Sequence, residues 1–294
     1  MMDEQQSQQK RKLSLLWARM AQNIDSDYLE AFLITSQAAG LEPSAGRSFG
    51  AGKSTLGLTI VYRAFAYENG TLYIDWDKQL IIDETPEDKQ FELMKKVIDN
   101  YVFWSLSDLL KAVKTASKRL PAVLWDDVQL DCPSWQNIPK NMREMIEELT
   151  VVRPLISNIV MTTPSISDIA KPLRRLVNWE VIIPDRAIYE VHFVSKKRNF
   201  YKPIEDMSRL WYDASGSFDK LPEEVLNLYK KRREEISREM KRVRSETKSM
   251  LDGKESFKEK VLKFYEAGYP PSTIAGFFRC KTEDIQRVLR EMGH

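Results

Sequence analysis

A short glycine-rich segment near residue 50 constrains the fold of this chain more than any other feature. Its residues are Phe49, Gly50, Ala51, Gly52, Lys53, Ser54 and Thr55. Such a segment is typical of the end of a phosphate-binding loop, where backbone N–H groups and the dipole of the following helix converge on phosphate oxygens. Lys53 would add a positive charge to the β- and γ-phosphates of a nucleotide, and Ser54 would give a hydroxyl to Mg²⁺. Gly50 and Gly52 lack the Cβ that would keep the backbone away from the phosphates.

The match to the full pattern G-x-x-x-x-G-K-[ST] is incomplete. The first glycine is expected at position 47, where this chain has Arg47, and Gly46 lies one residue early. The alternative is a chance match in a surface turn before a helix. The surrounding sequence favours a nucleotide site, because a helical pattern follows over residues 53–67 and an acidic strand end occurs further on.

Length and composition limit the kinds of fold, partner and cellular compartment that suit this chain. With 294 residues the chain can form an α/β domain with a substantial core and a small appendage. Charged residues make up 30% but nearly cancel at +2, so any nucleic-acid contact must come from local patches. Cys132 and Cys280 are far apart and match no metal spacing, which favours a reduced, cytoplasmic protein. No apolar run approaches the ~20 residues of a membrane span.

Residues 121–127 form the second informative stretch, an apolar run that ends in Asp126 and Asp127. This pattern predicts a buried parallel strand whose tip directs carboxylates into a ligand crevice. Asp126 is then placed to hold Mg²⁺ through water, and Asp127 to orient or deprotonate the attacking water. The alternative is an ordinary strand end followed by an acidic turn.

Two further places carry candidate catalytic residues. A predicted strand over 158–164 ends in Thr162 and Thr163, either of which could sense the γ-phosphate, although hydroxyls at strand ends also cap helices. Arg174 and Arg175 follow at the end of a predicted helix over 166–176. One of them could reach a neighbouring subunit's γ-phosphate as an arginine finger, and the alternative is a solvated helix terminus that favours cations.

The remaining α/β elements are less distinct. Apolar spacing predicts two helices over 12–39, and the strand that feeds the loop is then expected over 41–49. Residues 71–100 are predicted to be an insertion with helical content. Short strands are expected over 101–104 and 179–184, a helix capped by Ser107, another helix over 141–152, and an antiparallel hairpin between 188 and 212.

The C-terminal part is predicted to be helical throughout. A long, highly charged helix begins at Pro222, and three short helices follow over 254–294 with the apolar spacing of a helix-turn-helix. Gln286, Arg287 and Arg290 on the third helix would then face a DNA groove. The alternative is a three-helix unit that docks on a protein partner.

The motifs together resemble those of the additional-strand P-loop ATPases of the AAA+ kind. The run from Asp126 to Gln129 resembles the replication initiator DnaA and related helicase loaders and transposition ATPases. Residues 75–78, 119–121, 221–224 and 231–234 are similar to segments in uncharacterised ATPases of viruses and plasmids of hyperthermophilic archaea. The resemblance covers roughly residues 45–236 and implies ATP, Mg²⁺, self-association into a homo-oligomer and work on DNA. Arg47 departs from it, as does a strand-rich segment over 187–213, where AAA+ proteins have a helical lid with a second sensor arginine.

We therefore expect an α/β, three-layer P-loop NTPase with a mainly parallel sheet, followed by a small all-α helix-turn-helix unit. The expected divisions are an N-terminal helical segment (1–40), the ATPase domain (41–215), a linker helix (216–252) and the helix-turn-helix (253–294). The expected function is a DNA-directed ATPase of a mobile element, whose nucleotide state controls assembly on DNA for replication initiation, helicase loading, transposition or partition. The alternatives are a DNA-translocating or packaging motor, and a nucleotide switch that recruits a protein partner without touching DNA.

Overall fold

A computed structural model describes residues 9–26, 28–36, 52–132, 140–185, 188–197, 206–252, 256–278 and 280–294. The chain forms two compact units. The first comprises Met1–Gln136 and Ile146–Leu228, and the second comprises Asn137–Met145 and Tyr229–His294.

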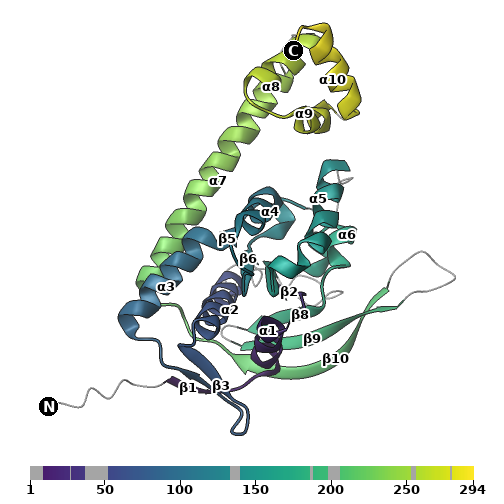
Figure 1. Cartoon of the computed structure of the whole chain (residues 1–294). Coiled ribbons are helices and arrows are strands. Elements are labelled where there is room, and N and C mark those ends of the chain that lie inside the picture. The colour runs from purple at the N-terminus through teal and green to yellow at the C-terminus, as the bar shows by residue number, and fades with distance from the viewer. Residues whose placement is uncertain are drawn as a thin grey trace. The chain divides into compact units, whose positions relative to one another are not determined.

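The first unit is built on a seven-stranded sheet with the order β10-β9-β8-β2-β7-β6-β5 (Figure 1). Pairing is parallel from β5 through β6, β7 and β2 to β8, and antiparallel for β8–β9 and β9–β10. The sheet is therefore mainly parallel, as expected, with an antiparallel hairpin at one edge. Its strands are β2 (Glu30–Thr35), β5 (Val102–Phe103), β6 (Val123–Trp125), β7 (Asn158–Thr162), β8 (Trp179–Asp185), β9 (Ile188–Lys197) and β10 (Asp206–Ser217).

The central strand β2 corrects one expectation. The predicted first helix is present as α1 (Leu15–Asp25), but the predicted second helix is wrong, because Glu30–Thr35 is a strand in which every residue is buried. A parallel strand that is covered on both faces has a continuous apolar run instead of an alternating one, so its pattern is easily mistaken for that of a helix. β2 occupies the position of the strand that feeds the loop, while residues 41–49 lie outside the described residues.

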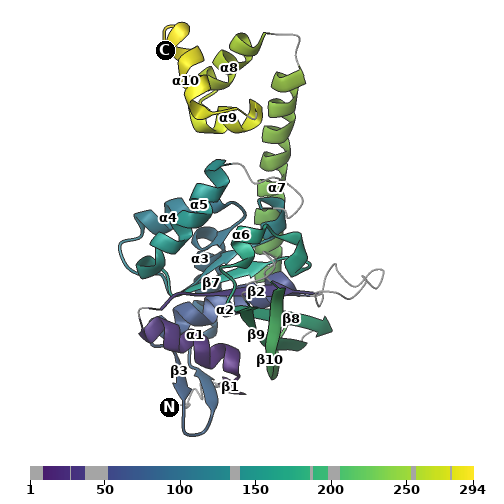
Figure 2. The same ribbon diagram turned by 90° about the vertical axis from the view of Figure 1, so that its right-hand side faces the viewer.

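Helices cover both faces of this sheet (Figure 2). α1 and α2 (Lys53–Glu68) lie on one side, and α4 (Leu106–Thr115) and α6 (Lys171–Arg174) lie on the other. α2 packs very closely on the sheet, since a Cβ added to Gly57 would come within 2.8 Å of the Leu124 side chain and 3.7 Å of that of Ile34. The predicted three-layer α/β architecture with a mainly parallel sheet is confirmed.

Residues 71–100, predicted to be an insertion, form two strands and a helix. β3 (Leu72–Asp75) and β4 (Leu80–Asp83) pair with β1 (Gln9–Lys12) in a separate three-stranded sheet, and α3 (Glu87–Asn100) follows. α4 is capped by Ser105, whose hydroxyl accepts a hydrogen bond from the Asp108 N–H at 3.2 Å, and not by Ser107 as predicted.

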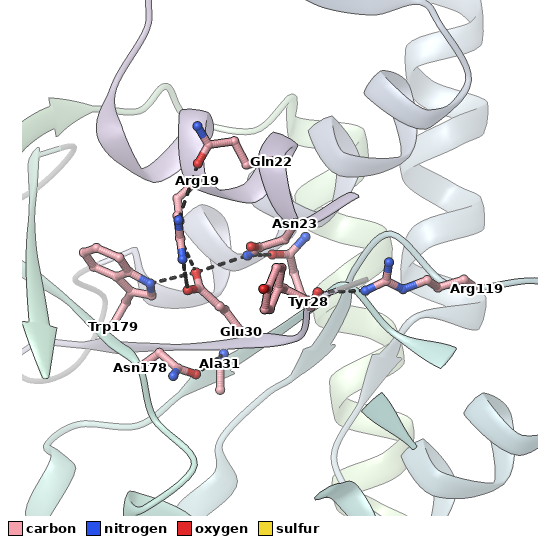
Figure 3. A network of polar contacts seen from close by, with 10 residues as sticks. Arg19, Gln22, Asn23, Tyr28, Glu30, Ala31, Arg119, Asn178 and Trp179 are labelled. Carbon is pink, nitrogen blue, oxygen red and sulfur yellow. Dashed lines mark hydrogen bonds and ion pairs between the residues drawn. The ribbon is translucent and has the colours of Figure 1, made fainter. Parts of the chain in front are cut away.

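A polar network fixes the start of β2 to α1 and β8 (Figure 3). The buried Glu30 carboxylate accepts hydrogen bonds from Arg19 Nη2 at 2.7 Å, from Trp179 Nε1 at 2.8 Å and from Asn23 Nδ2 at 3.1 Å. Hydrogen bonding to Glu30 raises the pKa of the Arg19 guanidinium above its ordinary value. The next residue in the strand, Ala31, donates its N–H to Asn178 Oδ1 at 2.9 Å.

The other described elements connect these layers or belong to the second unit. They are η1 (Val128–Leu130), α5 (Lys140–Val151), η2 (Arg153–Leu155), η3 (Ile166–Asp168), α7 (Glu223–Asp252), α8 (Phe257–Glu266), α9 (Pro271–Phe278) and α10 (Thr282–Glu291). Cys132 and Cys280 are both free thiols. Among the described helices, none combines the length and the apolar character that crossing a bilayer requires.

The three short helices of the second unit enclose a small core of their own. It consists of Val261, Phe264, Ile274, Ala275, Ile285, Val288 and Leu289. A capping box begins α8, because the Ser256 hydroxyl accepts from the Glu259 N–H while the Glu259 carboxylate accepts from the Ser256 N–H. An ion pair of 2.6 Å between Lys258 and Glu291 links α8 to α10.

Candidate nucleotide site

The candidate site lies at the carboxyl edge of the parallel strands, where ligands bind in open α/β sheets. β7 lies between β2 and β6, so the tip of one additional strand separates the strand that precedes the loop from the strand that carries the acids. Three contacts join the tips of β2 and β7. The Thr163 N–H donates to the Ile34 carbonyl at 3.1 Å. Both the N–H and the hydroxyl of Ser36 donate to the Pro164 carbonyl, at 3.2 Å and 3.4 Å.

Only the second half of the predicted loop belongs to the described residues. Gly52 immediately precedes α2 with φ +94°, a left-handed conformation that favours glycine. Thr55 is half-buried within the first turn of α2, where its carbonyl accepts a hydrogen bond from the Thr59 hydroxyl at 2.9 Å. Phe49, Gly50 and Ala51 lie outside the described residues, as does Arg47.

Lys53 begins α2 beside the tip of β2. Its Nζ donates a hydrogen bond to Ser36 Oγ at 3.2 Å, one residue past the end of that strand. A lysine at this position brings its charge to the helix N-terminus, where phosphate oxygens bind. Ser36 was not among the predicted site residues, because no sequence pattern relates it to Lys53.

Ser54, Asp126 and Thr162 meet in one hydrogen-bonded group. The Ser54 hydroxyl donates to Asp126 Oδ1 at 3.0 Å, and the Thr162 hydroxyl donates to the same oxygen at 2.5 Å. Asp126 and Thr162 are fully buried, and their strands are held in register by the Trp125–Met161 pair. The predicted pair of Ser54 and Asp126 is therefore brought into direct contact, and Thr162 bonds to the same carboxylate oxygen.

Asp127 differs from its neighbour in both conformation and contacts. It adopts a left-handed backbone, with φ 53° and ψ 46°, which few residues other than glycine, asparagine and aspartate adopt. Its N–H donates to Thr162 Oγ1 at 2.9 Å, and its Oδ1 lies 3.4 Å from Gln129 Nε2. Non-glycine residues in this conformation cluster at functional sites, because the surrounding structure must hold them there.

The two threonines at the tip of β7 have different surroundings. The Thr162 hydroxyl both donates to Asp126 and accepts from the Asp127 N–H, so it fixes both acids. The Thr163 hydroxyl is directed to the Ser165 carbonyl at 3.3 Å. Of the two candidate sensors, Thr162 is thus the one that contacts both acids, and this bridging arrangement was not predicted.

The two candidate arginine fingers also differ. Arg174 donates from Nε to the Ile169 carbonyl at 2.7 Å and from Nη2 to the Ser167 carbonyl at 3.1 Å. Partial burial lowers the pKa of its guanidinium below the ordinary value. Arg175 is exposed on the surface of the first unit and is the better placed of the two to reach another molecule.

The predicted DNA-contacting residues share one exposed side of α10. Gln286, Arg287 and Arg290 are exposed, whereas Ile285, Val288 and Leu289 face the core of the second unit. Arg287 forms an ion pair of 3.0 Å with Asp284, and Arg290 Nε donates to the Gln286 carbonyl at 3.2 Å. These side chains are therefore accessible at the surface of the second unit.

The donor set of the site suits a divalent cation that prefers oxygen. A hydroxyl and a fully buried carboxylate lie within 3.0 Å of each other, and Mg²⁺ takes few protein ligands together with phosphates and waters. Ser54 and Asp126 are the residues that would hold it. Among the described residues, no cluster of three or more histidine, cysteine, aspartate or glutamate side chains could hold a metal ion.

Comparisons with known proteins identify no family. No protein-family model matches the sequence, and no curated protein matches it either. Among solved structures, the chain is similar to the genome packaging NTPase B204 from Sulfolobus turreted icosahedral virus 2. The complex with ATP-gammaS has 8% identity and a TM-score of 0.31 over 57% of this chain and 92% of that chain. The complex with AMPPCP has 11% identity and a TM-score of 0.32 over 57% and 93%.

A third similar structure is the N-terminal domain of zonular occludens toxin from Neisseria meningitidis. It has 17% identity and a TM-score of 0.32 over 69% of this chain and 99% of that chain. TM-scores this low describe a distant likeness, so the strand order and the residues of the site must carry any functional conclusion.

Proposed function

We propose that this chain is a P-loop ATPase that binds ATP with Mg²⁺, hydrolyses it and works on DNA. The observation that carries the ATPase proposal is the group formed by Ser54, Asp126 and Thr162, in which two hydroxyls converge on one buried carboxylate at the start of α2. Sequence alone suggests Ser54 and Asp126 as partners, but they are 72 positions apart in the chain. Their direct contact supports a shared ligand at this edge of the sheet.

Each residue has a role that follows from its place. The N–H groups at the start of α2 and the Lys53 ammonium bind the phosphates, and Ser54 with Asp126 holds Mg²⁺, which neutralises charge on the phosphates. Asp127 orients the attacking water and accepts its proton, because it directly follows Asp126 and is held at the tip of β6 by the bond from its N–H to Thr162. Thr162 keeps both acids in place and reports changes near the γ-phosphate.

Replacement of Lys53 tests the ATPase proposal. Lys53→Ala removes the charge that binds the phosphates, so we expect ATP turnover to fall by about 100-fold or more. Lys89→Ala, an exposed lysine on α3, is the matched control and should leave turnover unchanged. Turnover by the Lys53 variant equal to that of wild type would refute the loop assignment.

The proposal that the protein works on DNA rests on the second unit. Its three helices have their own core, and α10 presents Gln286, Arg287 and Arg290 on an exposed side. We expect the full chain to bind duplex DNA with an affinity that falls steeply as salt rises, and the Arg287→Ala/Arg290→Ala double variant to bind more weakly with a smaller salt slope. Salt-independent or undetectable DNA binding would instead favour a nucleotide switch that recruits a protein through this unit.

Two kinds of DNA-directed ATPase remain to be distinguished. The resemblance to AAA+ proteins favours nucleotide-controlled assembly on the DNA of a mobile element, for replication initiation, helicase loading, transposition or partition. The second candidate is a translocating or packaging motor. It is favoured by β9 and β10, which extend the sheet where AAA+ proteins have a helical lid. The name of the packaging NTPase B204 agrees with a motor, but its TM-scores of 0.31 and 0.32 add no support.

DNA length separates these candidates. A motor should hydrolyse ATP faster on longer duplexes at equal total base-pair concentration, because each binding event supports more cycles. An assembly ATPase should instead change its particle size in light scattering when ATP and DNA are added, with turnover independent of length. An arginine finger from a neighbouring copy would make Arg175→Ala reduce turnover in the assembled state.

A further inference from the structure

An aromatic ring far away in the sequence contacts the last glycine of the phosphate-binding loop. A Cβ added to Gly52 would lie 3.0 Å from Phe218 Cζ and 3.1 Å from Cε2. The Phe218 side chain is only 6% exposed, so its ring is packed and does not project into solvent. The backbone of Gly52 is therefore in close contact with a side chain that follows β10 directly.

The ring of Phe218 is supported in turn by Tyr189 on β9. Their ring centroids are 6.4 Å apart, and the buried Tyr189 hydroxyl lies 2.8 Å from Ser14 Oγ. Gly216, which pairs with Tyr189, permits this arrangement because a Cβ there would come within 2.3 Å of the Tyr189 ring. A continuous set of contacts thus runs from the residue before α1 through β9 to the loop.

Phe218 also stands at the start of the link to α7. Asp219 forms an ion pair with Arg11, Leu221 is buried, and α7 begins at Glu223 with Val225 buried in its first turn. The link is therefore short and anchored within the first unit on both sides of Phe218. Close-packed contacts of this kind transmit displacements, because few voids exist to absorb them.

We propose that Phe218 is a positioning residue for the phosphate-binding loop, and that it couples nucleotide binding to the segment 219–228 that leads into α7. This inference rests on the proposed function, since it requires a nucleotide in the loop. Phosphates approach the backbone of the loop closely, so binding fixes the position of Gly52. Phe218 in contact with Gly52 is then fixed as well, and the link that follows it becomes more ordered.

The first test compares ligands that share phosphates. The dissociation constants of ATP and of inorganic tripolyphosphate are measured for wild type, Phe218→Ala and Phe218→Leu below the unfolding temperature of each. We expect Phe218→Ala to raise the dissociation constants of both ligands by a similar factor of about tenfold, which corresponds to a loss of about 1.4 kcal/mol of binding free energy. Phe218→Leu should restore most of the affinity, because it keeps apolar bulk against Gly52.

Two results of this test would overturn the positioning role. One is wild-type affinity for both ligands in Phe218→Ala. The other is weaker binding of ATP with unchanged binding of tripolyphosphate, which would assign the ring to the nucleoside. Phe65→Leu is the matched control, because Phe65 is equally buried but stacks on Tyr101 at 4.2 Å; it should lower the unfolding temperature without changing either affinity. Equal losses of affinity in both positions would reduce Phe218 to a general packing role.

The second test measures the coupling itself. Hydrogen exchange of the backbone amides in 219–228 is followed with and without saturating ATP. We expect exchange to slow in wild type on binding and to respond much less in Phe218→Ala at saturation. No response in wild type, or an equal response in both proteins, would overturn the coupling. Lys53→Ala separates the two proposals. If this variant binds and hydrolyses ATP normally, the proposed function fails. If it is inactive while the Phe218 variants bind both ligands like wild type, only the present inference is refuted.

Discussion

Opposite ends of the parallel strands hold buried carboxylates in contrasting surroundings, Glu30 at the start of β2 and Asp126 after the end of β6. At the start of the strand, Glu30 accepts hydrogen bonds from the cationic Arg19, from Trp179 and from Asn23 (Figure 3). At the carboxyl end of the sheet, after β6, Asp126 accepts from the hydroxyls of Ser54 and Thr162. Both carboxylates are buried, but a cation of the protein itself is bonded to Glu30, and hydroxyls are bonded to Asp126.

This difference separates an arrangement that stabilises the fold from one that is suited to a ligand. Burial of an ionised carboxylate is unfavourable unless charge and hydrogen bonds compensate it. For Glu30 the compensation comes from α1 and β8, so the network fastens a helix to the sheet. For Asp126 the hydrogen bonds come from the hydroxyls of Ser54 and Thr162, two oxygen-bearing side chains at the edge proposed as a nucleotide site.

The largest expected effect is on turnover at the ligand edge. Asp127→Asn keeps the shape of the side chain and removes its ability to accept a proton, so we expect ATP turnover to fall by about 10²- to 10⁴-fold with ATP affinity nearly unchanged. Steady-state hydrolysis and equilibrium binding of ATP measure the two quantities. Asp77→Asn, an exposed acid in the β3–β4 turn, is the matched control. Normal turnover in Asp127→Asn would remove Asp127 as the base.

At the start of β2, substitution of Glu30 should lower the stability of the fold. Glu30→Gln replaces an oxygen that accepts hydrogen bonds with an amide NH₂ that faces donors, so we expect the free energy of unfolding to fall by about 1–3 kcal/mol. Urea denaturation measures the change, and turnover of the folded variant should match wild type. Loss of turnover in fully folded Glu30→Gln would show that the two ends of the parallel sheet are not functionally separate.

Substitution of Thr162 should lower both the free energy of unfolding and ATP turnover, each by a smaller amount. Thr162→Val leaves the buried Asp127 N–H without its acceptor, which should lower the free energy of unfolding by about 1–2 kcal/mol. It also removes one of the hydrogen bonds to Asp126, so we expect turnover to fall by about tenfold, an amount equal to 1.4 kcal/mol. Thr162→Ser retains the hydroxyl and should recover most of both quantities. A stability loss without any change in turnover would limit Thr162 to a structural role.

The smallest effect is the coupling between Arg19 and Glu30. Arg19 is partly exposed, with 41% of its side chain accessible, so solvent screens the ion pair. A double-mutant cycle of Arg19→Met and Glu30→Gln, measured by urea denaturation, should give a coupling free energy of about 0.5–1 kcal/mol. A coupling near zero would mean that Asn23 and Trp179 alone hold Glu30.

The sequence was most informative where chemistry fixes the residue types. The lysine and serine at the start of α2, the acids after β6 and the threonines at the end of β7 could all be located, because the roles proposed for them restrict them to a few side chains. The parallel sheet and the helical C-terminal unit also followed from hydrophobic patterns. β2 could not be recognised, since Glu30–Thr35 is too short and too uniformly buried to show a period.

Contacts between distant segments were the second gap. Thr162 can bridge Asp126 and Asp127 because β7 lies next to β6 in the sheet. Local sequence patterns do not predict the order of the strands. The contact of Phe218 with Gly52 depends on the path of β9 and β10, and a single phenylalanine before a helix gives no signal of it.

The 3.2 Å contact between Lys53 Nζ and Ser36 Oγ bears on how this chain tolerates insertions and deletions. It brings together the two residues that flank positions 37–52, so the separation of these ends is set by the sheet and α2. Closing a longer stretch between fixed ends is inexpensive, with each doubling of length costing only about 0.6 kcal/mol in entropy. In chain entropy alone, a longer connection from Ser36 to Lys53 would therefore cost little, so the folded elements on either side and not the length of the connection fix the position of the lysine.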